Sequence, residues 1–327
     1  MNLSTVDAMS DIEGIVIRGI NNIYNVIPAE YLNQVQQAPV YACRIKGKVL
    51  QHVPDTYNPL AVGDRVLISV HQGNEGLILK RLERTNSFER WNAKRSMNQT
   101  LVANMDLVLI ITSTDQPPFR PRFIDRAIIC AHETPILIVL NKCDLMLTEE
   151  QHERFQLYAS LGYETFAMSA FDEQGHAALK ERLKGRTVAL IGQSGVGKST
   201  LVNALVKQHA DDEQKTAGIS QKYQRGRHTT NHALLLPGDD FNVVDTPGMR
   251  ELLVPHEDPY TLGEYFPEFR KLRNRCSFKP CLHVHEPDCA VREAVNSHEI
   301  HPDRYESYLR MIASLEERPD SWESDRR

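Results

Sequence analysis

The glycine-rich segment Gly192–Ser199 limits more than any other feature what this chain can fold into. It fits the pattern G-x-x-x-x-G-K-[ST], follows the apolar run Val188–Ile191 and precedes the helix-compatible run Thr200–Leu205. A strand, a glycine-rich turn and a helix in this order let backbone N–H groups and the helix N-terminus converge on a phosphate group. The segment therefore predicts a phosphate-binding loop within an α/β sheet.

Individual positions of this segment have expected roles toward a bound nucleotide. Lys198 is expected to reach the β- and γ-phosphates and to act in catalysis, and the Ser199 hydroxyl is expected to bind Mg²⁺. The residues expected to bind nucleotide here are Gly192, Gln193, Ser194, Gly195, Val196, Gly197, Lys198, Ser199 and Thr200.

A second motif, D-T-P-G at positions 245–248, ends the apolar run Phe241–Val244. The carboxylate of Asp245, at the end of a strand, suits Mg²⁺ coordination through water, and the Gly248 N–H is expected to meet a γ-phosphate. Alone, D-x-x-G is a common turn. Following the phosphate-binding loop along the chain, it is the partner that such a loop requires.

The N-K-C-D sequence at positions 141–144, which closes the apolar run Ile136–Leu140, indicates which base is bound. The Asp144 carboxylate can accept hydrogen bonds from N1–H and the 2-amino group of guanine, a pair of donors that adenine lacks. Asn141 is expected either to bond the other edge of the base or to tie this loop to the phosphate-binding loop. The expected base-binding residues are Asn141, Lys142, Cys143, Asp144, Ser169 and Ala170, with Lys142 over the ring face and the 168–170 backbone at guanine O6. The predicted nucleotide is GTP.

Strands that alternate with helices indicate a doubly wound, mainly parallel sheet over the middle of the chain. The predicted strands are Asp106–Thr112, Pro135–Asn141, Tyr163–Ser169, Thr187–Ile191 and Phe241–Asp245. The predicted helices are Arg122–Ala131, Glu149–Leu161, Gln174–Lys184 and Lys198–Lys207. In Ras-like GTPases the phosphate-binding loop comes first, whereas here both base-binding motifs precede it. A parallel sheet places each loop by its own strand, so these motifs predict a circularly permuted P-loop GTPase.

The N-terminal part reads as a small β-barrel. Five short β-rich runs are separated by turn signals, which fits an OB-fold. The runs are Gly14–Arg18, Ile23–Ile27, Val40–Leu50, Asp64–Val70 and Gly76–Leu82. Residues 41–95 carry ten Lys/Arg and five Asp/Glu, although the whole chain has a formal net charge of −5. This local excess suggests an RNA-binding surface, with an ordinary solvated face as the alternative.

Three cysteines lie close together near the C-terminus, at positions 276, 281 and 289, with two histidines among them. Residues 1–14 lack the apolar core of a signal peptide, so we expect a cytoplasmic protein in which such a cluster binds metal. Three thiolates and one imidazole close a tetrahedral structural zinc site. His283 and His285 are the rival fourth ligands. A basic rim around the cluster suits a phosphate backbone, or is a plain helix surface; it consists of Arg270, Lys271, Arg273, Arg275 and Lys279.

These regions predict an OB-fold RNA-binding domain over residues 1–90, a circularly permuted GTPase domain over 91–254 and a zinc-binding helical domain over 255–327. No apolar run approaches the ~20 residues of a membrane span, so no membrane partner is expected. The chain is expected to be a monomer.

The order of these parts resembles the bacterial small-ribosomal-subunit biogenesis GTPases, the RsgA or YjeQ family. The strings that carry the resemblance are C-R-I-K-G-K (43–48), V-G-D (62–64), A-N-M-D (103–106), the GTPase motifs and R-G-R-H-T-T (225–230). The resemblance implies association with the small (30S) ribosomal subunit and its rRNA late in assembly, and GTP hydrolysis stimulated by that subunit. Its pattern favours His283 as the fourth zinc ligand, together with Cys276, Cys281 and Cys289.

Hydrolysis requires an oriented water, which a Gln after D-x-x-G provides in many GTPases. Met249 stands at that position, and a thioether cannot orient water. By resemblance to the family, His228 is the residue that positions the water, with Thr229 or Thr230 closing on Mg²⁺.

Two other functions compete with a GTPase switch. The first is an RNA-binding assembly scaffold in which GTP is mainly a structural ligand. The second is a P-loop kinase, for which the N-K-x-D motif would have no purpose. GTP turnover with and without small subunits discriminates the scaffold from the switch.

Overall fold

The computed structural model describes residues 11–47, 49–50, 58–71, 73–131, 134–169, 171–206, 232–255 and 258–318. Its first strands form a closed barrel: β1 (Asp11–Ile20), β2 (Ile23–Pro28), β3 (Tyr41–Ile45), β4 (Arg65–Val70) and β5 (Glu75–Arg81). They pair in the order β1-β2-β3-β5-β4, and β1 closes the barrel by pairing with β4. The OB-like barrel predicted from the sequence is thereby confirmed.

Two features of the barrel region differ from the prediction. The third strand ends at Ile45, well before the predicted Leu50, because the chain turns at Gly47 with a φ of +52°. A 3₁₀ segment, η1 (Ala29–Gln37), follows β2. Among the cationic side chains of this basic region, Arg44 is exposed, and Lys48 lies outside the described residues.

A two-stranded hairpin connects the barrel to the central domain. Its strands are β6 (Ser87–Asn92) and β7 (Met97–Ala103), which pair antiparallel. The sequence interpretation did not identify this hairpin, because most of its side chains are polar and only partly buried. The domain boundary placed between residues 90 and 91 falls inside β6.

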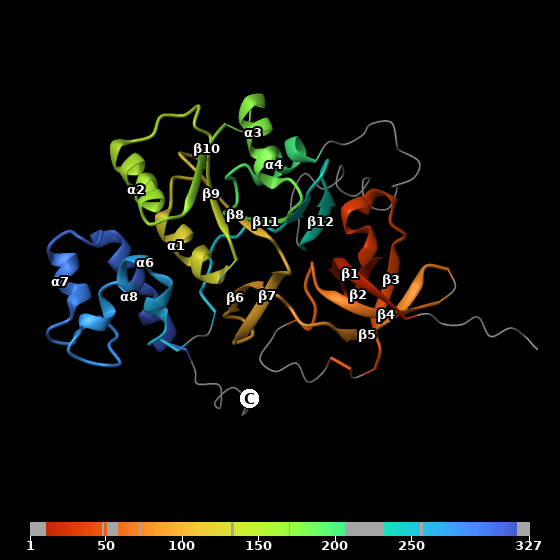
Figure 1. Cartoon of the computed structure of the whole chain (residues 1–327), viewed down its shortest axis with the longest axis horizontal. Coiled ribbons are helices and arrows are strands. Elements are labelled where there is room, and N and C mark those ends of the chain that lie inside the picture. Colours follow the sequence, from red (N-terminus) through yellow and green to blue (C-terminus); the bar gives the residue numbers. More distant parts are fainter. Residues whose placement is uncertain are drawn as a thin grey trace, which may run out of the picture.

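The central domain contains the predicted doubly wound sheet (Figure 1). Its strands are β8 (Leu107–Ser113), β9 (Ile136–Asn141), β10 (Glu164–Ala167), β11 (Thr187–Gly192), β12 (Leu234–Pro237) and β13 (Asn242–Asp245). The order is β10-β9-β8-β11-β13-β12, and every pair is parallel except β12 with β13. The strand β12 was not predicted.

Helices cover both faces of this sheet. They are α1 (Pro121–Cys130), α2 (Glu149–Ser160), α3 (Glu173–Leu183) and α4 (Lys198–Leu205). Phe123 of α1 and Phe155 of α2 belong to one buried cluster, whereas Leu179 of α3 and Leu201 of α4 belong to another. The fully buried strands between these layers explain the continuous apolar runs in the sequence.

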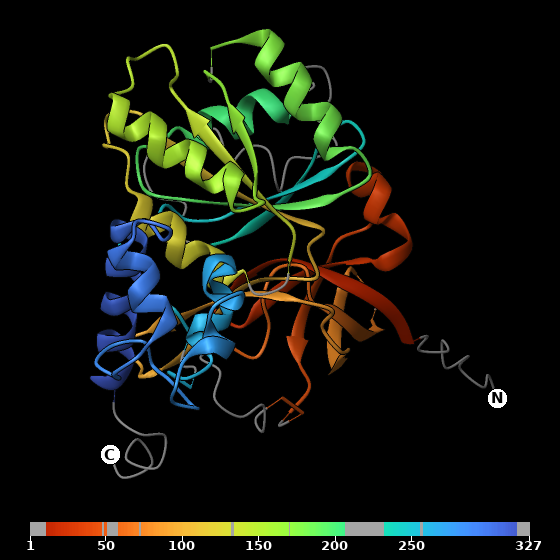
Figure 2. The same cartoon turned by 60° about the vertical axis from the view of Figure 1, so that its left-hand side comes forward.

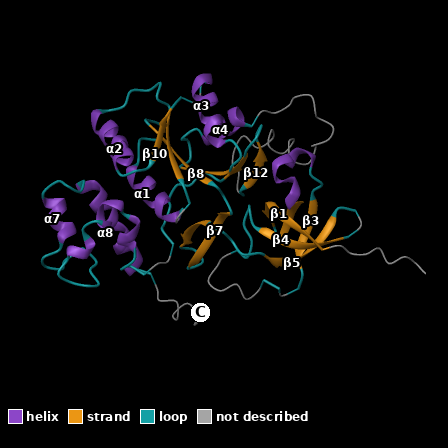
Figure 3. Ribbon diagram, in the orientation of Figure 1, coloured by secondary structure: helices purple, strands orange, loops and turns teal. Residues whose placement is uncertain are grey.

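A C-terminal module, residues 258–318, lies on the opposite side of the central domain from the barrel, beside α1 (Figures 1 and 2). It contains α6 (Pro267–Arg270), α7 (Ala290–Asn296) and α8 (Pro302–Glu316), with short 3₁₀ turns η2 (Leu262–Tyr265) and η3 (Arg273–Arg275). It is helical and irregular, in contrast to the β-rich barrel (Figure 3). Within the described ranges, no helix is long and apolar enough to cross a membrane.

Candidate functional site

The four nucleotide-binding motifs lie at one edge of the central sheet. The phosphate-binding loop follows β11, D-T-P-G follows β13, N-K-C-D begins at the last residue of β9, and Met168–Ser169 follows β10. These four strands are parallel, so their carboxyl ends share one edge. The permuted chain therefore brings together motifs that begin at positions 141, 168, 192 and 245 and so lie up to 104 residues apart along the sequence.

The phosphate-binding loop needs glycine where it meets the base-binding loop. Gly197 has a φ of +96°, and a Cβ placed on it would lie 2.3 Å from Nδ2 of Asn141. That Nδ2 donates a hydrogen bond to the Val196 carbonyl over 2.9 Å. Of the two roles expected for Asn141, the structure shows the tie between the loops.

The Asn141 side chain also leaves an acceptor without a partner. Its Oδ1 atom is buried and accepts no hydrogen bond within the described part of the chain. An unsatisfied buried acceptor costs about 1–3 kcal/mol, so a donor from a ligand or water is expected there.

Lys198 begins α4 and is buried, with 7% of its surface exposed. Its Nζ donates to the carbonyls of Gly192 (2.8 Å) and Gln193 (3.1 Å). Burial lowers the pKa of Lys198 to about 8, although Asp245 opposes the shift. A buried ammonium that bonds only carbonyls is a fitting partner for an anion, and phosphate oxygens meet this requirement.

Asp245 is also buried at this edge. Burial raises its pKa to about 6, and the charge of Lys198 opposes the shift. A bound cation would favour the ionised carboxylate, so the site fits Mg²⁺. The Ser199 and Thr200 side chains are exposed in the first turn of α4, directly after the phosphate-binding loop.

The segment after Asp245 lies against the phosphate-binding loop. Met249 N donates to the Gly192 carbonyl (3.2 Å), and Ser194 N donates to the Met249 carbonyl (3.3 Å). A Cβ on Gly248 would lie 3.0 Å from Cα of Ser194. The Met249 side chain is buried in the core, so it does not face a water at the nucleotide.

Hydrogen bonds join the two base-binding loops. Ser169 Oγ donates to Oδ1 of Asp144 over 2.7 Å, and Cys143 N donates to the Met168 carbonyl over 3.2 Å. The Asp144 carboxylate is exposed, as a ligand for a base must be. Ala170 lies outside the described residues.

Sequence reasoning missed the residues after β8 that support this loop. Thr114 N donates to the Asn141 carbonyl, and its Oγ1 donates to the Lys142 carbonyl over 2.9 Å. Lys142 Nζ donates to the Gln116 carbonyl, so its side chain extends toward the 115–116 turn. The sequence signal that could have identified them is a hydroxyl residue followed by turn-forming residues directly after a buried strand.

The three residues given roles in hydrolysis, His228, Thr229 and Thr230, lie outside the described residues. Their roles remain predictions.

The four expected metal ligands of the C-terminal module lie together. The ligand atoms of Cys276, Cys281, His283 and Cys289 are all within 4.8 Å of one another. Zinc bonds of about 2.3 Å to sulfur and about 2.0 Å to nitrogen place tetrahedral ligands roughly 3.5–3.8 Å apart. The distances between ligand atoms are 3.6 Å (Cys276 Sγ to His283 Nδ1), 3.8 Å (Cys276 to Cys289 Sγ), 3.9 Å (Cys281 to Cys289 Sγ) and 3.3 Å (His283 Nδ1 to Cys289 Sγ). This Cys₃His cluster fits a structural zinc ion.

Neighbouring residues hold the cluster's shape. The hydroxyls of Tyr305 and Tyr308 on α8 donate to the carbonyls of His283 and Leu282, both over 2.7 Å. Burial raises the pKa of the Cys281 thiol to about 12, which a bound cation would reverse. The rival ligand His285 is exposed.

Comparisons with known proteins agree with this geometry. The family model described as RsgA GTPase matches residues 81–255, and the model of the RsgA N-terminal domain matches residues 13–78. A protein of Borreliella burgdorferi named small ribosomal subunit biogenesis GTPase RsgA is 38% identical over 309 residues, covering 94% of this chain and 97% of its own. A Bacteroides fragilis protein of the same name is 36% identical over 313 residues, with 93% and 97% covered.

Solved structures show the same architecture. YjeQ from Thermotoga maritima superposes with a TM-score of 0.69 at 31% identity and covers 95% of this chain and 100% of its own. YloQ, described as a circularly permuted GTPase, has a TM-score of 0.66 at 26% identity, with 97% and 99% covered. The resemblance inferred from the motifs is confirmed: this chain belongs to the RsgA GTPase family and is a GTP hydrolase with a circularly permuted fold.

Proposed function

We propose that this protein is a cytoplasmic, monomeric GTPase that binds the small ribosomal subunit and its rRNA late in assembly and leaves it after hydrolysis. The observation that carries the proposal is similarity along the whole chain: 94% of it aligns with a relative named for small-subunit biogenesis. The barrel, the GTPase motifs and the Cys₃His cluster all lie within a fold shared by such proteins. The proposal assigns residues 1–90 to RNA binding, 91–254 to GTP and 255–327 to a zinc-stabilised contact with the subunit.

The proposed roles in the nucleotide site follow from chemistry and position. Asp144 selects guanine, and Lys198 neutralises the β- and γ-phosphates. Ser199 binds Mg²⁺ directly, and Asp245 binds it through water. The ion would supply charge neutralisation for the leaving phosphates. Buried Lys198 and Asp245, each with a shifted pKa, support this assignment because nucleotide and metal together would restore the charged form of both.

His228 is proposed to orient the attacking water, and Thr229 or Thr230 to close on Mg²⁺. Support comes from the burial of Met249, the residue at the position where many GTPases have Gln. Without small subunits, turnover is expected at about 10⁻⁴–10⁻² s⁻¹.

GTP turnover measured with and without purified small subunits tests the proposal. Saturating subunits are expected to raise the rate by at least tenfold in the parent protein. The His228→Ala protein should bind GTP normally but lose most of that stimulation, because the residue acts on water and not on the nucleotide. A parent rate that subunits leave unchanged would favour the scaffold function, in which GTP is a structural ligand.

A further inference from the structure

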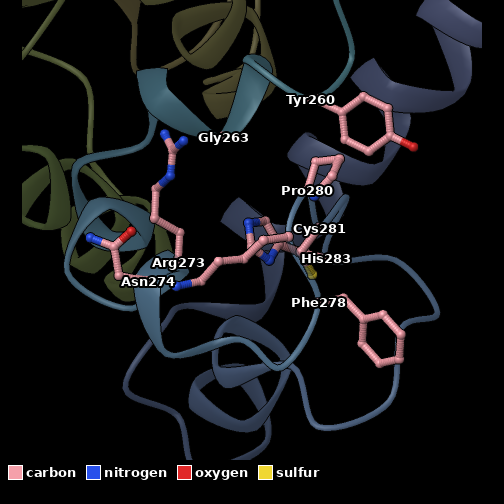
Figure 4. A pocket seen from close by; sticks show the side chains of 9 residues that line it. Tyr260, Gly263, Arg273, Asn274, Phe278, Pro280, Cys281 and His283 are labelled. Carbon is pink, nitrogen blue, oxygen red and sulfur yellow. The ribbon is translucent and has the colours of Figure 1, made fainter.

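A pocket on the C-terminal module has a composition that neither the nucleotide site nor the Cys₃His cluster explains (Figure 4). Its volume is about 170 Å³, and Cys281 and His283 form part of its wall. The other lining side chains include Tyr260, Phe278, Pro280, Arg273, Asn274 and Lys279. Figure 4 shows the rings of Tyr260, Pro280 and Phe278 along one side, with Arg273 and Asn274 on the other. The pocket therefore has an apolar side and a polar side.

The aromatic side chains of this pocket are more exposed to solvent than those that pack within the core of the module. Tyr260 is 47% exposed and Phe278 is 48% exposed, and they are two of only seven large hydrophobic residues exposed in the described part of the chain. Neither ring contacts another aromatic ring among the described residues. Buried aromatics of this module, in contrast, stack on each other, as Phe266 and Phe269 do at 4.9 Å. The two exposed rings are available for stacking on a ligand.

The polar side presents positive charge. Residues 269–285 carry five Lys/Arg and no carboxylate. Lys279 makes no ion pair with any described residue, and the Asn274 side chain makes no hydrogen bond within the described ranges. Arg273 pairs with Glu264 over 2.8 Å, but the two side chains are 37% and 54% exposed, and ion pairs in contact with solvent contribute little. Arg273 can therefore exchange this partner for a phosphate.

We propose that this pocket binds one unpaired RNA nucleotide, whose base stacks on Tyr260 and Phe278 while Arg273 and Lys279 contact the flanking phosphates. The inference rests on the proposed function, which supplies RNA as the partner. Pockets for whole small-molecule ligands usually measure about 300–1,000 Å³, so a volume of about 170 Å³ suits a single ring system. A base within a duplex cannot enter, because its faces are covered by its neighbours.

The test uses the full-length, zinc-loaded protein and a hexanucleotide RNA with one central 2-aminopurine. Stacking on the rings should quench the 2-aminopurine emission. Stacking contributes about 1–3 kcal/mol per base by alanine substitution, so the Tyr260→Ala, Phe278→Ala double variant should bind the strand at least tenfold more weakly. Tyr260→Phe keeps the ring and should bind as the parent does.

Two further measurements keep the result interpretable. Zinc content and turnover without subunits should be the same in the parent and in every variant, which shows that the double variant is folded. Parent emission that stays unquenched, or a double variant that binds within twofold of the parent, overturns the inference. If subunits still stimulate turnover in that case, the proposed function stands and only the pocket fails. If the strand binds through the rings but subunits leave turnover unchanged, the proposed function fails instead.

Discussion

The two modules that flank the central domain are joined to it by different physical means. The barrel continues the central sheet: β1 pairs with β12 at Arg18 and Leu234, so one eleven-stranded sheet runs through both. Ile17 and Ile27 of the barrel also share a buried cluster with Val244 and Leu235 of the central domain. This junction is made of backbone pairing and apolar side chains.

The C-terminal module instead has a separate apolar cluster, which includes Ile129 of α1 and Val254, and it also meets α1 and α2 through buried charges. Arg304 of α8, 1% exposed, donates to Asp125 of α1 over 2.6 Å and to Glu268 of α6 over 2.8 Å. Asp125 also accepts from Arg154 of α2 (3.3 Å) and from the Tyr158 hydroxyl (2.7 Å). These four charged side chains form the buried part of a network that Arg154 extends to the partly exposed Asp303 over 3.2 Å.

This difference has a consequence for how each module can detach. An apolar junction that is continuous with a sheet separates only when both domains unfold. A charged junction loses its stability when one partner is removed, because the remaining charge stays buried. We therefore infer that the C-terminal module is the separable one, and the following predictions test that inference.

Loss of a metal ligand should have the largest effect, and it should stay local. Structural zinc contributes about 10–16 kcal/mol to the folding of small zinc domains. Cys289→Ser should reduce bound zinc from one per chain to near zero and remove hydrogen-exchange protection from α7 and α8. GTP binding should survive, because the nucleotide loops belong to the central sheet. His285→Ala, at the exposed neighbour, is the matched control and should retain zinc. GTP binding that is lost together with the metal would contradict a separable module.

Removal of the central arginine should have the next largest effect. Arg304→Ala leaves Asp125 and Glu268 without their main partner, and breaking a buried pair in this way costs about 3–5 kcal/mol. Arg310→Ala on the same helix removes an exposed pair with Glu306 and should change the stability much less, because solvent screens that pair. Urea unfolding of both proteins measures the difference. Equal stability of the two variants would show that the buried charges do not hold this junction.

An apolar truncation at the barrel junction should cost somewhat less but spread further. Ile17 is 1% exposed, and Ile→Ala substitutions in a core cost about 2–5 kcal/mol. We expect Ile17→Ala to lower the free energy of unfolding by about 3 kcal/mol. Barrel structure and GTP binding should be lost at the same urea concentration, because both domains share the cluster. The exposed Ile23→Ala provides the control. A barrel that unfolds while GTP remains bound would show that the two junctions are alike.

The sequence predicted the parts of the fold that depend on local pattern. The expected strand Thr187–Ile191 and helix Glu149–Leu161 lie within one residue of β11 and α2, because apolar runs and the Thr148 cap mark their ends. The placement of the nucleotide-binding motifs at one edge of the sheet could be predicted as well, since each motif sits at the end of its strand. The 234–237 strand was missed because its four residues are all apolar and too few to show an alternation.

The charged junction had no local signal at all. Asp125 and Arg304 are separated by 179 residues, and each looks like an ordinary helix charge in its own segment. The pairing arises only when α8 packs against α1. Similarly, no spacing rule links Trp91 of the hairpin to Arg318 after α8, although these two side chains meet in the folded protein.

That contact leads to the smallest expected effect. The Arg318 guanidinium lies 4.8 Å from the centre of the Trp91 ring, and its Nη1 donates to the Pro255 carbonyl over 2.9 Å. Burial lowers the pKa of Arg318 to about 10, so part of its hydration has been given up for these contacts. Arg318→Ala should therefore cost about 1 kcal/mol, within the usual range for a cation over an aromatic ring. Arg318→Lys keeps the charge but loses the planar group, and should recover only part of that loss.

Because Trp91 N also donates to the Leu253 carbonyl, this contact ties the end of the C-terminal module to the hairpin and to the segment after D-T-P-G. Urea unfolding of the single variants and of the Arg304→Ala, Arg318→Ala double variant provides the measurement. If the junction is one cooperative unit, the double variant should lose less than the sum of the two single losses, whereas strict additivity would show that the module is held at two independent points.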